Sequence, residues 1–129
     1  MLAPSAERDG SVARILVDAD VLLDHLRGQR RFIPADDVVH VSAVTRAELA
    51  AMTGTIDSPV TRLLDAMTEI PVDAAIAQRG GMIRRLTGVP LANALIAATA
   101  LEHDLTLVTR NLWEYKGIAG LDAMAPEAR

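Results

Sequence analysis

The chain contains no cysteine, which excludes a disulfide framework and any metal site built on thiolates. It also lacks an apolar run that approaches the ~18–20 residues of a transmembrane helix, and residues 1–12 are too polar for a signal peptide. We therefore expect a cytoplasmic protein without a membrane segment. Its 129 residues are enough for one domain. We expect a disordered or tag-like start over 1–12, followed by a single domain over 13–129.

Aromatic residues and lysine are scarce. Aromatic side chains make up 2% of the sequence, so stacking on bases is not a main source of affinity for a nucleic acid. The net charge of −4 argues against a nonspecific nucleic-acid binder, whose domain is usually basic. The basic residues are nearly all arginine, and several of them cluster at Arg27, Arg30 and Arg31, and at Arg79, Arg84 and Arg85. Such clusters indicate contacts with RNA or an acidic peptide, or else solvated helix faces with salt bridges.

Short apolar runs alternate with helical patterns along the chain. The runs predict strands at 13–17, 38–41, 70–72, 105–109 and 121–124. Cap residues, glycine and proline delimit predicted helices at 21–27, 45–52, 57–68, 73–86 and 91–103. Strands that alternate with helices indicate an α/β fold with a mostly parallel sheet of about four to five strands, flanked by helices on both faces.

Local cap signals assign the predicted helix starts. Asp20 is expected to cap the helix over 21–27, and Asp73 the helix over 73–86. Thr45 and Glu48 fit a capping box, in which the glutamate has a purely structural role. Asp57, followed by a proline in the first turn, opens the helix over 57–68.

Acidic and amide side chains stand where predicted strands end or helices begin. Asp18 follows the first apolar run, and Asn111 follows the run over 105–109. Glu48 and Asn93 lie near the starts of predicted helices. Ligands of parallel sheets bind outside the carboxyl ends of the strands. Acids that meet at one such edge are what a Mg²⁺ or Mn²⁺ site requires, because these hard ions prefer oxygen ligands.

The order and spacing of these segments resemble a known family. The segments are Ile15-Leu16-Val17-Asp18-Ala19-Asp20-Val21-Leu22-Leu23, Val44-Thr45-Arg46-Ala47-Glu48-Leu49, Pro90-Leu91-Ala92-Asn93-Ala94-Leu95-Ile96-Ala97-Ala98-Thr99-Ala100 and Leu107-Val108-Thr109-Arg110-Asn111. They are similar to those of PIN-domain ribonucleases, above all the VapC-type toxins of type II toxin–antitoxin systems. The resemblance covers about residues 15–121, which is nearly the whole chain.

The resemblance implies a PIN-like three-layer fold and a Mg²⁺- or Mn²⁺-dependent endoribonuclease. The metal ligands would be Asp18, Glu48 and the residue at the position of Asn93, with Asn111 as a fourth site residue. The family also implies a homodimer, an RNA substrate and a cognate VapB-type antitoxin. The antitoxin's tail would fill the acidic cleft, often by placing an arginine there.

Two positions depart from the family pattern, and the role of a third allows two interpretations. Asn93 stands where the family has an aspartate, and its neutral amide is a poorer ligand, so we expect impaired catalysis. A deliberate inactivating substitution, an escape mutation selected against toxicity, or a natural degenerate copy would each explain it. Asp20 stands where relatives usually carry asparagine and could add a carboxylate to the rim of the site. Glu114 is either a further site acid or a solvated loop residue.

Two other functions compete with this interpretation. Asp18 and Asp20 fit the Asp-x-Asp motif of haloacid-dehalogenase-like phosphohydrolases, in which the first aspartate is the nucleophile. That class requires a further acidic pair after a later strand, and it leaves Glu48 unexplained. The other alternative is a non-catalytic PIN domain that serves only as a binding module.

Overall fold

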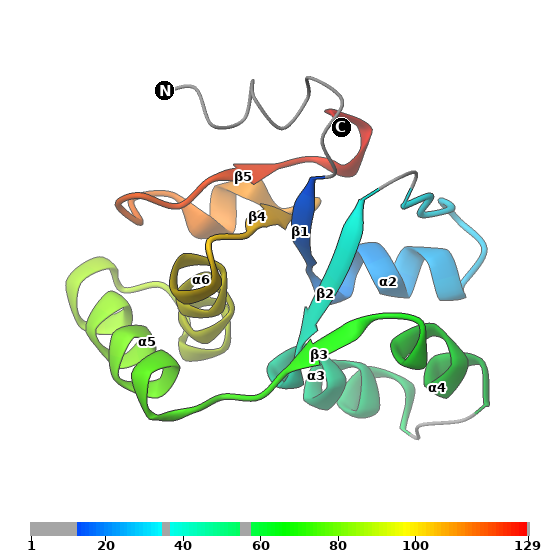
Figure 1. Ribbon diagram of the computed structural model, residues 1–129, viewed down its shortest axis with the longest axis horizontal. Coiled ribbons are helices and arrows are strands. Elements are labelled where there is room, and N and C mark those ends of the chain that lie inside the picture. The colour runs from blue at the N-terminus through cyan, green and yellow to red at the C-terminus, as the bar shows by residue number, and fades with distance from the viewer. Residues whose placement is uncertain (1–12, 35–36, 55–57, 129) are drawn as a thin grey trace.

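The computed structural model describes residues 13–34, 37–54 and 58–128, which form a parallel sheet covered by helices (Figure 1). Its strands are β1 (Arg14–Val17), β2 (Val38–Ser42), β3 (Thr68–Ile70), β4 (Thr106–Val108) and β5 (Ala123–Met124). Its helices are α2 (Ala19–Leu26), α3 (Ala43–Thr53), α4 (Ser58–Asp65), α5 (Ala74–Thr87) and α6 (Leu91–His103), with 3₁₀ helices η1 (Leu112–Tyr115) and η2 (Pro126–Ala128). None of the described helices is long and apolar enough to cross a membrane.

The order of the strands in the sheet is β3-β2-β1-β4-β5, and every pair is parallel. The expectation of an α/β fold with a parallel sheet is therefore confirmed. β1 lies in the centre, and the chain builds β2 and β3 outward on one side of it before β4 and β5 form on the other. The change of direction lies between β1 and β4, and such a switch point leaves a crevice at the carboxyl ends of the two strands.

Two hydrophobic clusters lie on opposite faces of the sheet. Ile15 and Val17 of β1 belong to the cluster that includes side chains of α2 and α4. Leu16, between them, belongs to the cluster that includes side chains of α5 and α6. This alternation follows from the two-residue period of a strand. Because both faces are covered, β1 is apolar at successive positions, which explains its continuous run in the sequence.

The predicted strand and helix positions are close to those observed, with three corrections. Asp18, rather than Asp20, caps α2, since its Oδ1 accepts a hydrogen bond from the Ala19 N–H. Ser42 caps α3, so the predicted capping box of Thr45 and Glu48 is wrong and both residues lie inside the helix. The third strand is β3, slightly earlier than the predicted 70–72, so the helix predicted over 57–68 ends at Asp65 and Thr68 lies in the strand. The expectations for residues 1–12 and for Asp57 lie outside the described residues.

The two adjacent glycines of α5 have different surroundings. A Cβ on Gly80 would lie 2.6 Å from Leu95 Cδ2 and 3.2 Å from Leu95 Cα, whereas a Cβ on Gly81 would meet nothing within 4 Å. We expect Gly80→Ala to destabilise the fold by ~1–3 kcal/mol, because α5 and α6 would have to separate. Gly81→Ala should stabilise it by ~0.5–1 kcal/mol, because alanine is the better helix former. Urea denaturation of the matched pair measures both effects, and equal shifts would contradict the close approach.

Candidate functional site

A cleft of about 230 Å³ opens at the carboxyl ends of the central strands. It is lined by Asp18, Ala19, Asp20, Glu48, Met52, Asn93, Asn111 and Glu114. The four residues predicted from the sequence as site residues, Asp18, Glu48, Asn93 and Asn111, all lie in this lining. They come from the end of β1, α3, α6 and the turn after β4, so the fold brings together segments that are far apart in the chain.

Asp18 is fixed in place by hydrogen bonds to both of its carboxylate oxygens. Oδ1 accepts from the Ala19 N–H at 2.8 Å, which caps α2. Oδ2 accepts from the Thr109 hydroxyl at 2.9 Å and from the Tyr115 hydroxyl at 2.8 Å. The Asp18 N–H donates to the Val108 carbonyl at 2.9 Å. The residue is 6% exposed, so these donors replace most of the water that a carboxylate would otherwise bind.

Asp20 lies in the first turn of α2 beside Asp18. Its Oδ2 accepts from the Arg110 N–H at 3.1 Å and from the Thr109 hydroxyl at 3.3 Å, while its buried Oδ1 has no hydrogen-bond partner among the described residues. Burial, together with the nearby charge of Asp18, raises the pKa of Asp20 to about 6. The backbone N–H groups of Arg110 and Val21 and the Thr109 hydroxyl oppose this shift, but on balance the environment disfavours the charge of Asp20.

Glu48 faces the cleft from α3, one turn after the fully buried Thr45. Its Oε1 is buried and has no hydrogen-bond partner within the described part of the chain, and the same holds for Thr45 Oγ1. Burial raises the pKa of Glu48 to about 7, and the charges of Asp18, Asp20 and Glu114 add to the shift. A buried polar atom without a partner costs about 1–3 kcal/mol, so a ligand that reached this oxygen would reduce that cost.

Asn93 lies half-buried in the first turn of α6. The N-cap of this helix is Pro90, so Asn93 does not serve as its cap. Asn111 and Glu114 follow β4, Asn111 as the residue that precedes η1 and Glu114 within it. The Asn111 N–H donates to the Thr109 hydroxyl at 3.1 Å, which ties this turn to Asp18. All three side chains line the cleft.

The charge of the cleft favours a cation. Among the described residues that line it, four are carboxylates and none is basic. Carboxylates that are brought close repel each other unless a cation lies between them, and their oxygens are the ligands of Mg²⁺ and Mn²⁺. The described residues contain no group of three Asp, Glu or His side chains drawn close enough to enclose an ion. An ion in this cleft would therefore have few direct protein ligands and would keep several waters, as Mg²⁺ usually does.

Tyr115 is a site residue whose role was not predicted from the sequence. It is 4% exposed, and burial together with the charge of Asp18 raises the pKa of its hydroxyl, which therefore stays protonated and donates to Asp18. The Thr109 hydroxyl, which was not predicted as a site group either, lies 2.9 Å from Asp18 Oδ2 and 3.3 Å from Asp20 Oδ2 and can donate to one of them at a time. The sequence signal for both residues is that they lie in the segment around the predicted Asn111 and Glu114.

Two arginines of the predicted clusters make contacts within the protein. Arg79 pairs with Glu102 at 2.6 Å, and Arg84 donates to the carbonyl of Gly88 at the end of α5. These two arginines therefore make contacts within the protein, as expected if the clusters lie on solvated helix faces with salt bridges. Arg110, outside both clusters, pairs with Asp24 at 3.0 Å and with Glu127 at 2.6 Å, which anchors the turn after β4.

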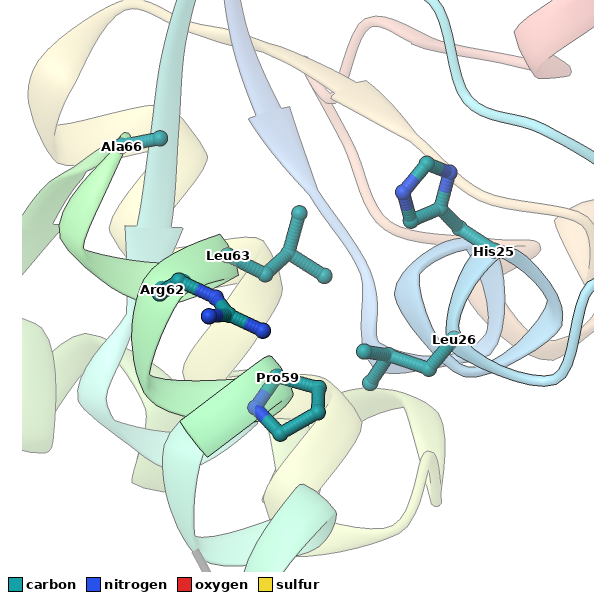
Figure 2. A pocket seen from close by; sticks show the side chains of 6 residues that line it. All are labelled: His25, Leu26, Pro59, Arg62, Leu63 and Ala66. Atoms are coloured by element: carbon teal, nitrogen blue, oxygen red, sulfur yellow. The ribbon is translucent and has the colours of Figure 1, made fainter. Parts of the chain in front are cut away.

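A second hollow, of about 410 Å³, lies between α2 and α4. Figure 2 shows its lining, which consists of His25 and Leu26 from α2, Pro59, Arg62 and Leu63 from α4, and Ala66, which follows α4. It carries no carboxylate among the described residues that line it, so it cannot hold a hard divalent cation in the way the first cleft can. The His25 Nδ1 accepts from the Phe32 N–H at 3.1 Å, which gives this histidine a structural contact.

Comparisons with known proteins agree with this geometry. Residues 15–112 match the family model described as PIN domain. Ribonuclease VapC10 of Mycobacterium tuberculosis is 39% identical over an alignment of 113 positions, and the match covers 78% of this chain and 85% of that protein. A toxin–antitoxin complex from Klebsiella pneumoniae contains a chain that is 28% identical, with a TM-score of 0.72 and coverage of 87% of this chain and 97% of that one.

A DNA-bound VapBC from Salmonella typhimurium shares the fold, with 19% identity, a TM-score of 0.73 and coverage of 89% of this chain and 99% of that one. The parallel sheet, the site segments in their expected order and the match to the family model all agree with the resemblance seen in the sequence. The chain therefore belongs to the PIN domain family and, within it, to the VapC-type ribonucleases.

Proposed function

We propose that this chain is a metal-dependent endoribonuclease toxin that hydrolyses RNA phosphodiesters with Mg²⁺ or Mn²⁺, and that Asn93 reduces its activity. Asp18 and Glu48 would hold the ion, with a weaker contribution from the amide of Asn93 and help from Asn111. The related Ribonuclease VapC10 supports the reaction class. Because the proposed substrate is RNA, we propose that the protein acts in the cytoplasm.

The observation that carries the proposal is the unpartnered Oε1 of Glu48, buried in a cleft that also contains Asp18 and no basic side chain among the described residues that line it. A cation would stabilise a carboxylate oxygen in this position, because no hydrogen-bond donor of the described residues reaches that oxygen. An RNA phosphate is repelled by the same carboxylates. The cleft therefore favours phosphate binding only when a cation neutralises it.

A divalent ion held by Asp18 and Glu48 would supply activation of water for attack on the phosphodiester and charge stabilisation for the leaving group. The residues of this chain supply the positioning. The hydroxyls of Tyr115 and Thr109 fix the rotamer of Asp18, and the Thr109 hydroxyl also holds the backbone of Asn111. Arg110 ties the same turn to Asp24 and Glu127, so the site is organised before any ligand enters.

The test of the proposal is metal-dependent cleavage of a broad RNA pool by the purified chain. We expect slow cleavage with Mn²⁺ and loss of cleavage with EDTA. Asp18→Asn should lower the rate at least ~10-fold, because it removes a charge that the ion requires. Cleavage that persists unchanged in EDTA or in Asp18→Asn would come from a contaminant and would count against the proposal.

We also propose a homodimer that a basic VapB-type antitoxin neutralises. Met82 and Leu86, one turn apart on α5, are 50% and 76% exposed, which supports an apolar contact between copies. The carboxylates that line the cleft would attract a basic antitoxin tail, which supports the proposed partner. Light scattering at tens of micromolar should give a dimer mass, and antitoxin affinity should fall at least ~10-fold between ~50 mM and ~500 mM salt. A monomer, or an affinity independent of salt, would contradict the corresponding half of this prediction.

The phosphohydrolase alternative accounts for fewer observations. Both oxygens of Asp18, its required nucleophile, already accept hydrogen bonds. It also leaves unexplained why Glu48 and Asn93 line the same cleft. The non-catalytic binding module differs from the proposal only in activity, so the RNA cleavage assay separates the two.

A further inference from the structure

The carboxylate of Asp20 is oriented toward the cleft but contributes to no function described above. Its Oδ2 is held by the Arg110 N–H at 3.1 Å, and its Oδ1 is buried without a partner in the described part of the chain. Arg110 itself is anchored through its side chain, at 3.0 Å from Asp24 and 2.6 Å from Glu127. The Arg110 backbone, which is itself tied to Asp24 and Glu127, therefore holds one oxygen of Asp20, whereas the other oxygen accepts no hydrogen bond from the described residues.

The neighbouring carboxylate of Asp18 has less free capacity. Each carboxylate oxygen offers about two lone-pair sites, and Asp18 Oδ2 accepts from both Thr109 and Tyr115. Thr109 has one hydroxyl proton, and it lies closer to Asp18 (2.9 Å) than to Asp20 (3.3 Å). Asp18 Oδ2 therefore has both acceptor sites filled, whereas Asp20 Oδ1 accepts no hydrogen bond that meets the same geometric criteria among the described residues.

We propose that Asp20 is a direct ligand of the divalent ion and supplies the negative charge that Asn93 does not. The proposal rests on the proposed function, because it requires an ion in this cleft. The ion would meet two buried oxygens without protein donors among the described residues, Asp20 Oδ1 from α2 and Glu48 Oε1 from α3. Asp18 then adds its charge while its hydrogen bonds hold it in place.

The test is Mn²⁺ binding, measured by the electron paramagnetic resonance signal of free Mn²⁺ and by the rise in melting temperature with Mn²⁺. Asp20→Asn keeps the shape of the side chain and an oxygen that can accept from the Arg110 N–H. We expect it to bind Mn²⁺ at least ~10-fold more weakly than the unchanged chain. Asp104→Asn is the matched control. Asp104 is exposed at the far end of α6 with φ 54°, a conformation that asparagine tolerates, so Mn²⁺ binding should not change.

The double variant Asp20→Asn with Asn93→Asp moves one carboxylate across the cleft and should bind Mn²⁺ about as tightly as the unchanged chain. If Asp20→Asn lowers the melting temperature without metal, Asp20→Ser is measured instead, because its hydroxyl can also accept from the Arg110 N–H. Equal Mn²⁺ affinity of the Asp20 variant and the unchanged chain would overturn this proposal and leave the ribonuclease standing. Mn²⁺ binding by Asn93→Asp but not by the unchanged chain would also overturn the role of Asp20 and leave the proposed ribonuclease activity in place. Absence of binding in every variant would overturn both.

Discussion

Asn93→Asp should raise both Mn²⁺ affinity and RNA cleavage by at least ~10–100-fold, the range commonly lost when groups around a metal site are altered. Asn93 lines the cleft with Asp18 and Glu48, so an aspartate there adds a charge where the ion would lie. Asparagine and aspartate have nearly the same shape. The change therefore tests charge and not packing. Cleavage of the RNA pool and Mn²⁺ titration measure the two effects.

The same substitution should destabilise the metal-free protein. Two unit charges about 4 Å apart repel by roughly 4 kcal/mol at an effective dielectric of 20. The opposing effect is a favourable interaction of the introduced carboxylate with the start of α6, which is worth only ~0.3–1 kcal/mol. Repulsion therefore wins without metal, and Mn²⁺ should raise the melting temperature of the variant more than that of the unchanged chain.

Two controls make this result specific. Asp18→Asn in the Asn93→Asp background should abolish the gained cleavage, because it removes a second carboxylate from the same cleft. Asp104→Asn in that background should retain the gain. A variant that binds Mn²⁺ tightly but remains inert on RNA would favour the non-catalytic binding module.

Between pH 5 and pH 8 the metal-free chain should lose stability relative to Glu48→Gln. The pKa of Glu48 is raised from 4.5 to about 7 in the folded protein, chiefly by burial. A raised pKa means that the folded state binds more protons than the unfolded state in this range. The stabilisation is therefore fully present below about pH 4.5 and is lost as the pH rises through about 7. Glu48 is partly exposed to solvent, which screens the effect, so we expect a difference of about 1–2 kcal/mol.

Urea denaturation of both proteins across this pH range measures the difference. Comparison with Glu48→Gln cancels the titration of carboxylates outside the cleft, because both proteins share them. Mn²⁺ should restore the stability of the unchanged chain at pH 8 and have little effect at pH 5, because the ion competes with the proton for the carboxylate. A parallel pH dependence of the two proteins would show that the environment of Glu48 does not disfavour its charge.

Several features of the protein followed from the sequence alone. The apolar runs and the alternation of strands with helices predicted the parallel sheet, because burial on both faces requires continuous apolar strands. Helix α6 was predicted with its observed bounds, Leu91–His103, because its sequence is rich in alanine and uninterrupted by glycine or proline. The positions of Asp18 and Asn111 after apolar runs predicted that they would lie at one edge of the sheet, and both line the cleft.

Other features were decided only by the tertiary structure. Ser42 and Thr45 are both good N-cap residues, three positions apart, and cap preferences do not distinguish between them. In the fold β2 continues to Ser42, whose hydroxyl then accepts from the Val44 N–H, while Thr45 is buried inside α3. Likewise Gly80 and Gly81 are identical in the sequence, and only the approach of α6 distinguishes them.

The detailed chemistry of the cleft also depended on contacts between distant segments. The sequence placed the carboxylates near one another, since strand ends in a parallel sheet share an edge. It did not show that Tyr115 donates to Asp18 across 97 positions, or that the Arg110 backbone fixes one oxygen of Asp20 across 90. Those hydrogen bonds depend on how the turn after β4 folds back over β1. Sequence patterns thus determined which residues could reach the site, and packing decided which of their oxygens remain free to bind an ion.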